Sequence, residues 1–162
     1  MDITFRPIGV ISTPFPESRG TPIQPQSAEG TVGTVKVFPE FIQGLQDLDG
    51  FSHIFLLYHF HRCQGFSLLV KPFLDEVKRG VFATRAPARP NPIGLSIVRL
   101  ERIENDTLHV LDVDMLDGTP LLDIKPFVPA FDAREQTRIG WLTHNLEKLK
   151  AMKDDGRFLP EK

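Results

Sequence analysis

The sequence predicts a mainly β protein, folded as a small closed or strongly curved β-barrel with a C-terminal helix. Short β-branched and aromatic runs recur along the chain and are separated by turn residues. Fourteen prolines in 162 residues exceed the usual share of roughly 5%, which favours loops and strand edges over helices. One helical repeat stands out, after residue 137, where Leu142, Leu146, Leu149 and Met152 recur every three to four positions.

Local patterns define the elements of the first sixty residues. Pro7 favours an edge position for the first strand because proline cannot donate to a sheet ladder. The loop that follows is long for a compact domain, which indicates a mobile or functional segment. The expected elements are a strand at 5–12, this loop at 13–30, a strand at 30–38, a helical turn at 39–48 and a central strand at 48–60.

The second half of the chain continues this pattern of short strands and turns. Val98 and Leu100 alternate with Arg99 and Glu101, as expected of a strand with one buried face. Further strands are expected at 68–73, 81–84, 93–103, 108–116 and 121–127, with turns at 105–106 and 117–120.

The bulk composition is that of a globular protein with one domain, 41% hydrophobic and 25% charged. Thirteen phenylalanines against one tryptophan and one tyrosine predict a Phe-rich core. The lone cysteine, Cys63, excludes an intramolecular disulfide, fits a reducing compartment and is interpreted as a packed thiol. No signal-peptide pattern and no apolar run of roughly 20 residues is present, so we expect a cytoplasmic protein without membrane contact.

The charge distribution and the histidine spacing indicate whether the protein binds nucleic acid or a metal ion. The net charge of −2 is not that of a typical nucleic-acid binder. Seven basic residues nevertheless fall between Lys71 and Arg102, which indicates either a local basic surface or ordinary solvated faces. His53, His59 and His61 share a strand face, but no cysteine or carboxylate completes a recognisable spacing, so no metal is expected.

The most distinctive stretch is 79–96, which contains three prolines at 87, 90 and 92. Their spacing forbids a helix and predicts a stiff, extended loop. Arg85, Arg89 and Asn91 lie on this proline loop, and two guanidinium groups on a stiff backbone suit a carboxylate or phosphate. A plain surface loop with solvated arginines is the alternative. Gly94 permits a sharp exit or a close ligand approach.

The motifs TRAPARPNPIGLS at 84–96 and DGTPLLDIKP at 117–126 are long and irregular. Together with IGVI at 8–11 and GFSH at 50–53, they resemble the TrmO family, also called TsaA-like or YaeB-like, over about residues 5–131. The resemblance implies a small β-barrel, a site for S-adenosyl-L-methionine (SAM) and a homodimer. The family's characterised activity is methylation of N6 of threonylcarbamoyl-adenosine beside the tRNA anticodon.

Position-by-position matching to the family implies cofactor contacts in four places. They are Gln24, Pro25 and Gln26 in the long loop, His61 and Arg62 after the apolar strand, Arg85 and Leu95 around the proline loop, and Asp117, Gly118, Thr119 and Pro120 in the turn. Arg85 suits the cofactor's carboxylate, and Asp117 suits an amine or a ribose hydroxyl. Arg89 and Asn91 are assigned to the tRNA anticodon loop.

Longer members of the family carry a separate C-terminal domain, whereas here residues 1–135 are expected to form the barrel and 136–162 a C-terminal helical extension of the same domain. Bacterial members often have glycine in place of Gln26 and a residue other than arginine in place of Arg62.

The chemistry leaves several alternatives open. No two glycines are two residues apart, so the Rossmann fingerprint cannot occur and a SAM enzyme with this sequence needs another fold. A general base would help if the acceptor nitrogen must lose a proton. Asp117 is the candidate that we name; Asp112 and Asp114 are further candidates, interpreted more readily as solvated strand residues. The alternative functions are methylation of a small molecule and SAM binding without turnover.

Overall fold

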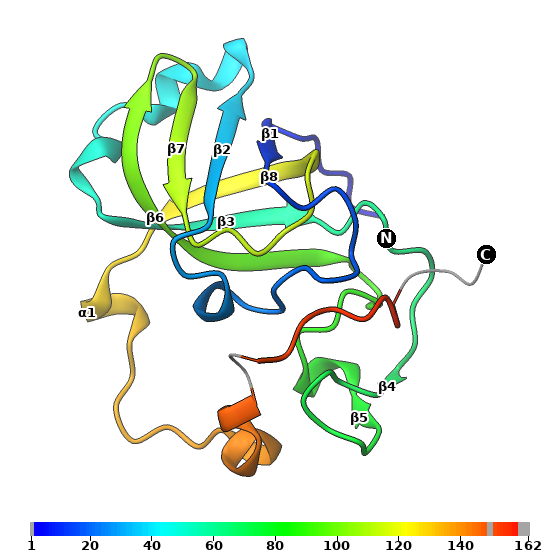
Figure 1. Ribbon diagram of the computed structural model, residues 1–162. Coiled ribbons are helices and arrows are strands. Elements are labelled where there is room, and N and C mark those ends of the chain that lie inside the picture. Colours follow the sequence, from blue (N-terminus) through cyan, green and yellow to red (C-terminus); the bar gives the residue numbers. More distant parts are fainter. Residues whose placement is uncertain (1, 149–150, 159–162) are drawn as a thin grey trace.

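Six antiparallel strands close into a barrel, which confirms the predicted fold class. The computed structural model describes residues 2–148 and 151–158 (Figure 1). The strand order around the barrel is β1-β2-β7-β6-β3-β8, with β8 pairing back to β1. The strands are β1 (Gly9–Ser12), β2 (Val32–Val37), β3 (His53–His59), β6 (Ile93–Glu104), β7 (Thr107–Leu111) and β8 (Thr119–Pro126). The β6–β7 hairpin turns at 105–106 as predicted, with Asn105 at φ 55°.

The barrel core is aliphatic, so the prediction of a Phe-rich core was wrong. Its fully buried members include Ile11, Val35, Ile54, Leu56, Leu108, Val110 and Leu121. None of the thirteen phenylalanines, all of which lie in the described part of the chain, is among the buried residues. The interior of a small barrel has room for branched aliphatic side chains in alternation, and larger rings are displaced outward. Phe82 and Phe131, for example, are 77% and 70% exposed.

Several predicted strands are shorter than expected, and one is not formed. The segment Leu48–Gly50 is a 3₁₀ turn entered through Asp47 in the left-handed region, so the strand predicted from residue 48 begins at His53. The strand predicted at 81–84 is a 3₁₀ turn, Val81–Ala83, held by the Thr84 hydroxyl donating to the Val81 carbonyl at 2.8 Å.

The remaining short elements lie mostly beside the barrel. β4 (Leu69–Val70) and β5 (Arg79–Gly80) form a separate two-stranded sheet. The others are 3₁₀ turns at Pro25–Ser27 and Pro39–Leu45 and the single-turn helix α1 (Pro129–Asp132). Within the described ranges no helix is long and apolar enough to cross a membrane.

The continuous amphipathic helix predicted from residue 137 is not formed in the described residues. Two 3₁₀ turns, Gly140–His144 and Leu146–Lys148, stand there instead, and Leu149 lies outside the described residues. Gln136 and Gly140 both have positive φ, which interrupts helical backbone. The segment docks on the rest of the chain through the Trp141 indole N–H, which donates to the Ala83 carbonyl at 2.8 Å, so tertiary contact overrides helical propensity.

The last described residues, 151–158, return beneath the barrel toward the long loop (Figure 1, red). The Gly20 N–H donates to the Asp154 carbonyl at 2.7 Å, and the Asp154 N–H donates to the Thr21 carbonyl at 2.9 Å. Ser18 and Asp154 also share a side-chain hydrogen bond. This C-terminal segment is therefore tied to the long loop near the N-terminus.

Close packing between β3 and β6 explains Gly94. Gly94 pairs with Tyr58, and a Cβ atom at this position would overlap the Tyr58 ring. With the ring seated over the glycine, the Tyr58 hydroxyl lies 3.0 Å from Ser96 Oγ. The contact that requires glycine is thus with an aromatic ring of the protein.

We predict that Gly94→Ala lowers the free energy of unfolding by about 1–3 kcal/mol, because the added methyl forces the ring or the strand to move. Gly44→Ala is the matched control, since a Cβ at Gly44 meets no atom within 4 Å, and its effect is expected to stay within about 0.5 kcal/mol. Urea denaturation of both variants measures the difference. Equal stability of the two variants would contradict this account of Gly94.

Candidate active site

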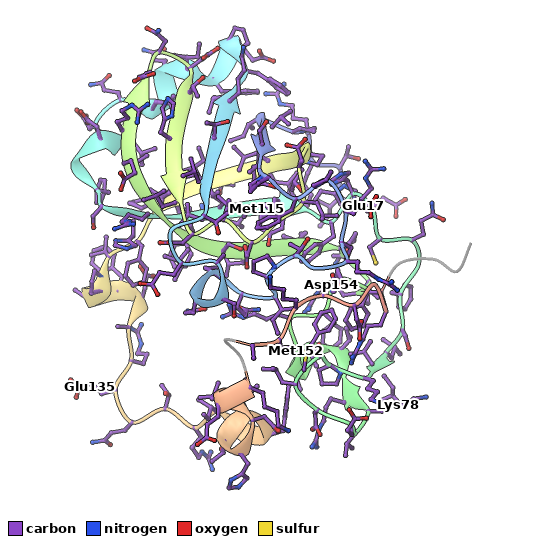
Figure 2. All side chains as sticks on the ribbon, viewed as in Figure 1. Glu17, Lys78, Met115, Glu135, Met152 and Asp154 are labelled. Atoms are coloured by element: carbon purple, nitrogen blue, oxygen red, sulfur yellow. The ribbon has the colours of Figure 1, made fainter. Side chains whose placement is uncertain are left out.

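A cavity of about 880 Å³ lies at the end of the barrel, within the size range of small-molecule sites. Six parts of the chain form it: the barrel end, the long loop, the proline loop, residues 72–74, residues 141–146 and the C-terminal segment. Figure 2 labels Met115 at the barrel end and Asp154 on the C-terminal segment, and both line the cavity. The cavity is therefore built from segments that are far apart in the sequence.

The structure brings together many of the predicted cofactor-binding residues. Those that line the cavity are Gln24, Gln26, His61, Arg62, Arg85, Leu95 and Thr119. Arg85 Nη1 donates to Gln24 Oε1 at 3.1 Å and so joins the proline loop to the long loop. The guanidinium keeps further N–H groups for a ligand, because arginine has five donors.

Other predicted site residues do not line the cavity. They are Pro25, Asp117, Gly118, Pro120 and Asn91. The Asp117 carboxylate accepts a hydrogen bond from the Thr13 N–H at 3.0 Å, and the Asp117 N–H donates to the Phe15 carbonyl at 2.8 Å. The turn at 117–118 thereby fixes the start of the long loop. The family-implied ligand contacts of these five residues, and the catalytic role suggested for Asp117, stay predictions.

Arg89 lines the cavity, but its guanidinium also shapes the proline loop. Arg89 Nη1 donates to the carbonyls of Thr84 and Ala86, at 3.1 and 3.2 Å. Prolines supply no N–H groups, so the loop depends on side-chain donors of this kind. Binding of tRNA by Arg89 stays a prediction, and any such contact would share the guanidinium with these carbonyls.

His61 and Thr119 form one polar corner of the cavity. Thr119 Oγ1 lies 3.4 Å from His61 Nδ1 and donates to the Leu116 carbonyl at 2.7 Å. Burial, followed by the positive charge of Arg62, holds the pKa of His61 below its usual value. At neutral pH the imidazole is therefore uncharged and adds no repulsion toward a cationic ligand.

The sequence names Asp114 as a further candidate base but favours a solvated strand position for it, and the solvated position is wrong. It lines the cavity, and its Oδ1 accepts a hydrogen bond of 2.6 Å from Ser96 Oγ. Burial raises the pKa of Asp114 to about 7, against the opposing effects of the Ser96 hydrogen bond and the charge of Arg85. Burial also raises the pKa of Tyr58, so its hydroxyl keeps its proton.

The backbone conformation at Asp112 explains why the strand predicted at 108–116 is wrong beyond Leu111. β7 ends at Leu111, and Asp112 has a φ of 70°, so the predicted strand at 108–116 stops early. The Asp112 carboxylate accepts the Gly30 N–H at 2.7 Å, away from the cavity lining. Val113 and Met115 are both buried. Asp112 also lies between two apolar residues, Leu111 and Val113, so the local sequence alone does not single out Asp114.

Cys63 is a packed thiol, as predicted. Its sulfur lies 3.6 Å from the Phe158 carbonyl, and burial raises the thiol pKa, which disfavours the reactive thiolate.

Among residues 2–148 and 151–158, no group of three His, Cys, Asp or Glu side chains is placed to hold a metal ion. His53 instead contacts the Ser52 hydroxyl at 2.9 Å.

Comparison with known proteins identifies the family. Residues 10–133 match the family described as the tRNA-methyltransferase O N-terminal domain. The chain belongs to the TrmO family. A crystal structure of TrmO from Pseudomonas aeruginosa superposes with a TM-score of 0.73 at 41% identity, covering 87% of this chain and 63% of that one.

Two kinds of TrmO relative differ in length. A probable S-adenosyl-L-methionine-binding protein of Pyrococcus abyssi is 60% identical over 156 residues, covering 96% of this chain and 85% of the relative. A tRNA (adenine(37)-N6)-methyltransferase of Mus musculus is 37% identical over 145 residues, covering 85% of this chain but 34% of the mouse enzyme. The chain thus spans most of the archaeal relative and about a third of the mammalian one.

Proposed function

We propose that this protein is a SAM-dependent methyltransferase that acts on N6 of threonylcarbamoyl-adenosine beside the tRNA anticodon. The observation that carries the proposal is the cavity at the barrel end, where four sequence segments that resemble the TrmO cofactor site meet. Family membership supports it, as do relatives named for SAM binding and for tRNA adenine N6 methylation.

The residues around the cavity fit SAM, which supplies an activated methyl group on a sulfonium. Arg85 would bind the carboxylate of its amino-acid part, with Gln24 holding the guanidinium in place. Apolar side chains such as Leu95 and Leu116 offer a surface for the flat adenine. His61 is uncharged at neutral pH, so this part of the wall adds no repulsion toward the cationic part of the ligand. Catalysis of this kind depends mainly on positioning.

We predict that Arg85→Ala weakens SAM binding by at least tenfold, because a hydrogen bond to a charged group is worth about 1.5–3 kcal/mol. Arg99→Ala is the control, since Arg99 lies on the outward face of β6, paired with Glu101 at 3.6 Å. Isothermal titration calorimetry measures both affinities. Absence of binding by the unaltered protein would contradict the cofactor assignment, whereas unchanged affinity in Arg85→Ala would contradict only the role of Arg85.

The tRNA footprint is expected to be small. The chain has a net charge of −2, and phosphate contacts dominate the affinity of proteins for nucleic acids. Phe82 lines the cavity and is 77% exposed, which suits stacking against an unpaired base of the anticodon loop. Arg62 and Arg85 at the same cavity provide positive charge.

We predict transfer of a labelled methyl group to an anticodon stem-loop that carries threonylcarbamoyl-adenosine. Phe82→Ala is expected to lower kcat/KM for the stem-loop about tenfold, the loss of one stacked base, with SAM affinity unchanged. Phe131→Ala is the control, because Phe131 is 70% exposed but does not line the cavity. Mass spectrometry of tRNA nucleosides from a deletion strain tests the assignment in the cell. Persistence of the methylated nucleoside at wild-type level, with no second methylase present, would refute it.

The archaeal relatives support an alternative. They are named for SAM binding alone, and this chain covers 85% and 96% of two of them, from Pyrococcus abyssi and Methanothermobacter thermautotrophicus. A SAM-binding module without turnover, or methylation of a small molecule, therefore becomes the better proposal if total tRNA accepts no labelled methyl group.

A homodimer is also proposed, supported by an apolar outer face on β3 and β6. Ile93, Leu95 and Ile97 point outward and are 36–45% exposed, and Phe55 and Leu57 pair with Ile97 and Leu95 on the neighbouring strand. Leu95 also lines the cavity, so this face is continuous with the site.

We predict that the protein sediments as a dimer at micromolar concentration and that Ile97→Glu converts it to a monomer, because a charge would then be buried in an apolar interface. Val32→Glu is the control, as Val32 is 63% exposed on β2, outside this face. A monomer for the unaltered protein in analytical ultracentrifugation would reject the dimer.

Two further assignments accompany the proposal. Residues 1–135 are proposed to form the SAM-binding barrel domain and 136–162 an extension of it; Trp141, Leu142 and Phe158 support this because they line the cavity. A cytoplasmic location is proposed as well, consistent with the unpaired thiol of Cys63.

A further inference from the structure

Two residues of the cavity wall, Tyr58 and Asp114, are joined through the buried hydroxyl of Ser96. Tyr58 OH lies 3.0 Å from Ser96 Oγ, and Ser96 Oγ donates to Asp114 Oδ1 at 2.6 Å. Ser96 gives its single proton to Asp114, so Tyr58 is the donor in the first contact. Throughout the described residues, Ser96 is the one side chain that hydrogen-bonds Asp114.

We propose that Asp114 is the proton acceptor for methyl transfer, and that Ser96 and Tyr58 position its carboxylate. This inference rests on the proposed function. As the acceptor nitrogen forms its bond to the methyl carbon, the carbon–sulfur bond breaks and its electron pair stays on sulfur. The N–H electron pair returns to nitrogen and the proton passes to Asp114, which becomes a neutral acid.

The other two aspartates named as candidate bases are engaged elsewhere. The Asp117 carboxylate accepts the Thr13 N–H and the Asp112 carboxylate accepts the Gly30 N–H, and neither residue lines the cavity. The acceptor nitrogen carries its hydrogen between an adenine ring and a carbonyl, so its lone pair is delocalised and attack requires loss of that proton. A base whose pKa lies near the working pH is best suited to this task.

The surroundings of Asp114 tune it for this role. Burial raises its pKa to about 7, while the Ser96 hydrogen bond and the positive charge of Arg85 act in the opposite direction. Tyr58, the other titratable group in contact with the network, stays protonated. The carboxylate is thus available at neutral pH and is basic enough to take a proton.

Single-turnover methyl transfer to the modified stem-loop, at saturating SAM and between pH 5.5 and 8.5, tests the proposal. The rate of the unaltered protein should rise with pH to a plateau above the pKa of Asp114. Asp114→Asn should lose at least about 100-fold in rate, the usual worth of a general base, with SAM affinity within threefold. Asp112→Asn, the matched control, should keep both the rate and the pH profile.

The pH profile of Ser96→Ala distinguishes a positioning role of Ser96 from a purely structural one, because loss of structure alone would not shift the profile. Without the hydrogen bond that favours the carboxylate, the pH profile should shift to higher pH, and Tyr58→Phe should shift it less in the same direction. This arm keeps the proposal testable if Asp114→Asn does not fold.

Protein stability gives a readout that needs no turnover. Asp114 has a higher pKa in the folded than in the unfolded state, so the folded protein binds the proton more tightly. Its contribution is fully present below pH 4 and is lost as the pH rises to about 7. The urea midpoint of the unaltered protein should therefore fall relative to that of Asp114→Asn over this window.

Three results would overturn the role of Asp114 while leaving the proposed function intact: turnover by Asp114→Asn within threefold of the unaltered rate, loss of SAM binding in that variant, or a pH-independent difference in urea midpoints. Failure of the unaltered protein to methylate the stem-loop is a different outcome, because it refutes the proposed function and this inference with it.

Discussion

Closure of the barrel through β1 is the constraint on which the rest of the structure depends. Four residues, Gly9–Ser12, pair with β2 on one side, and three of them also pair with β8 on the other. Closure leaves the barrel without free strand edges and fixes a narrow interior that aliphatic side chains fill. Tyr58 lines the cavity at the barrel end, and its hydroxyl contacts the buried Ser96 hydroxyl.

Strand periodicity made much of the barrel predictable. Alternation along 93–103 placed Val98 and Leu100 inside, and the turn at 105–106 fixed the hairpin that follows. Patterns of this kind report which face of a strand is buried. They do not report the diameter of the barrel interior. The abundance of phenylalanine therefore led to the wrong prediction of a Phe-rich core.

The site was predictable where the chain repeats a family motif and not where tertiary geometry decides. The motif around Arg85 was informative because its residues are distinctive, and the structure places Arg85 beside Gln24. The burial of Asp114 could not be predicted from the sequence, because its position depends on a positive φ at Asp112 and on packing by distant segments. The leucine repeat after residue 137 predicted a helix because of its spacing. That spacing carries no information about tertiary contacts, such as the hydrogen bond from Trp141 to Ala83.

The attachment of the C-terminal segment to the long loop has a consequence for biosynthesis. The barrel strands are complete at Pro126, but the cavity also needs Trp141, Asp154 and Phe158. A nascent chain emerges from the ribosome N-terminal end first. The barrel can therefore form while translation continues, whereas the ligand chamber is finished only after Phe158 has emerged, and cofactor occupancy becomes a mark of a chain translated through to that segment.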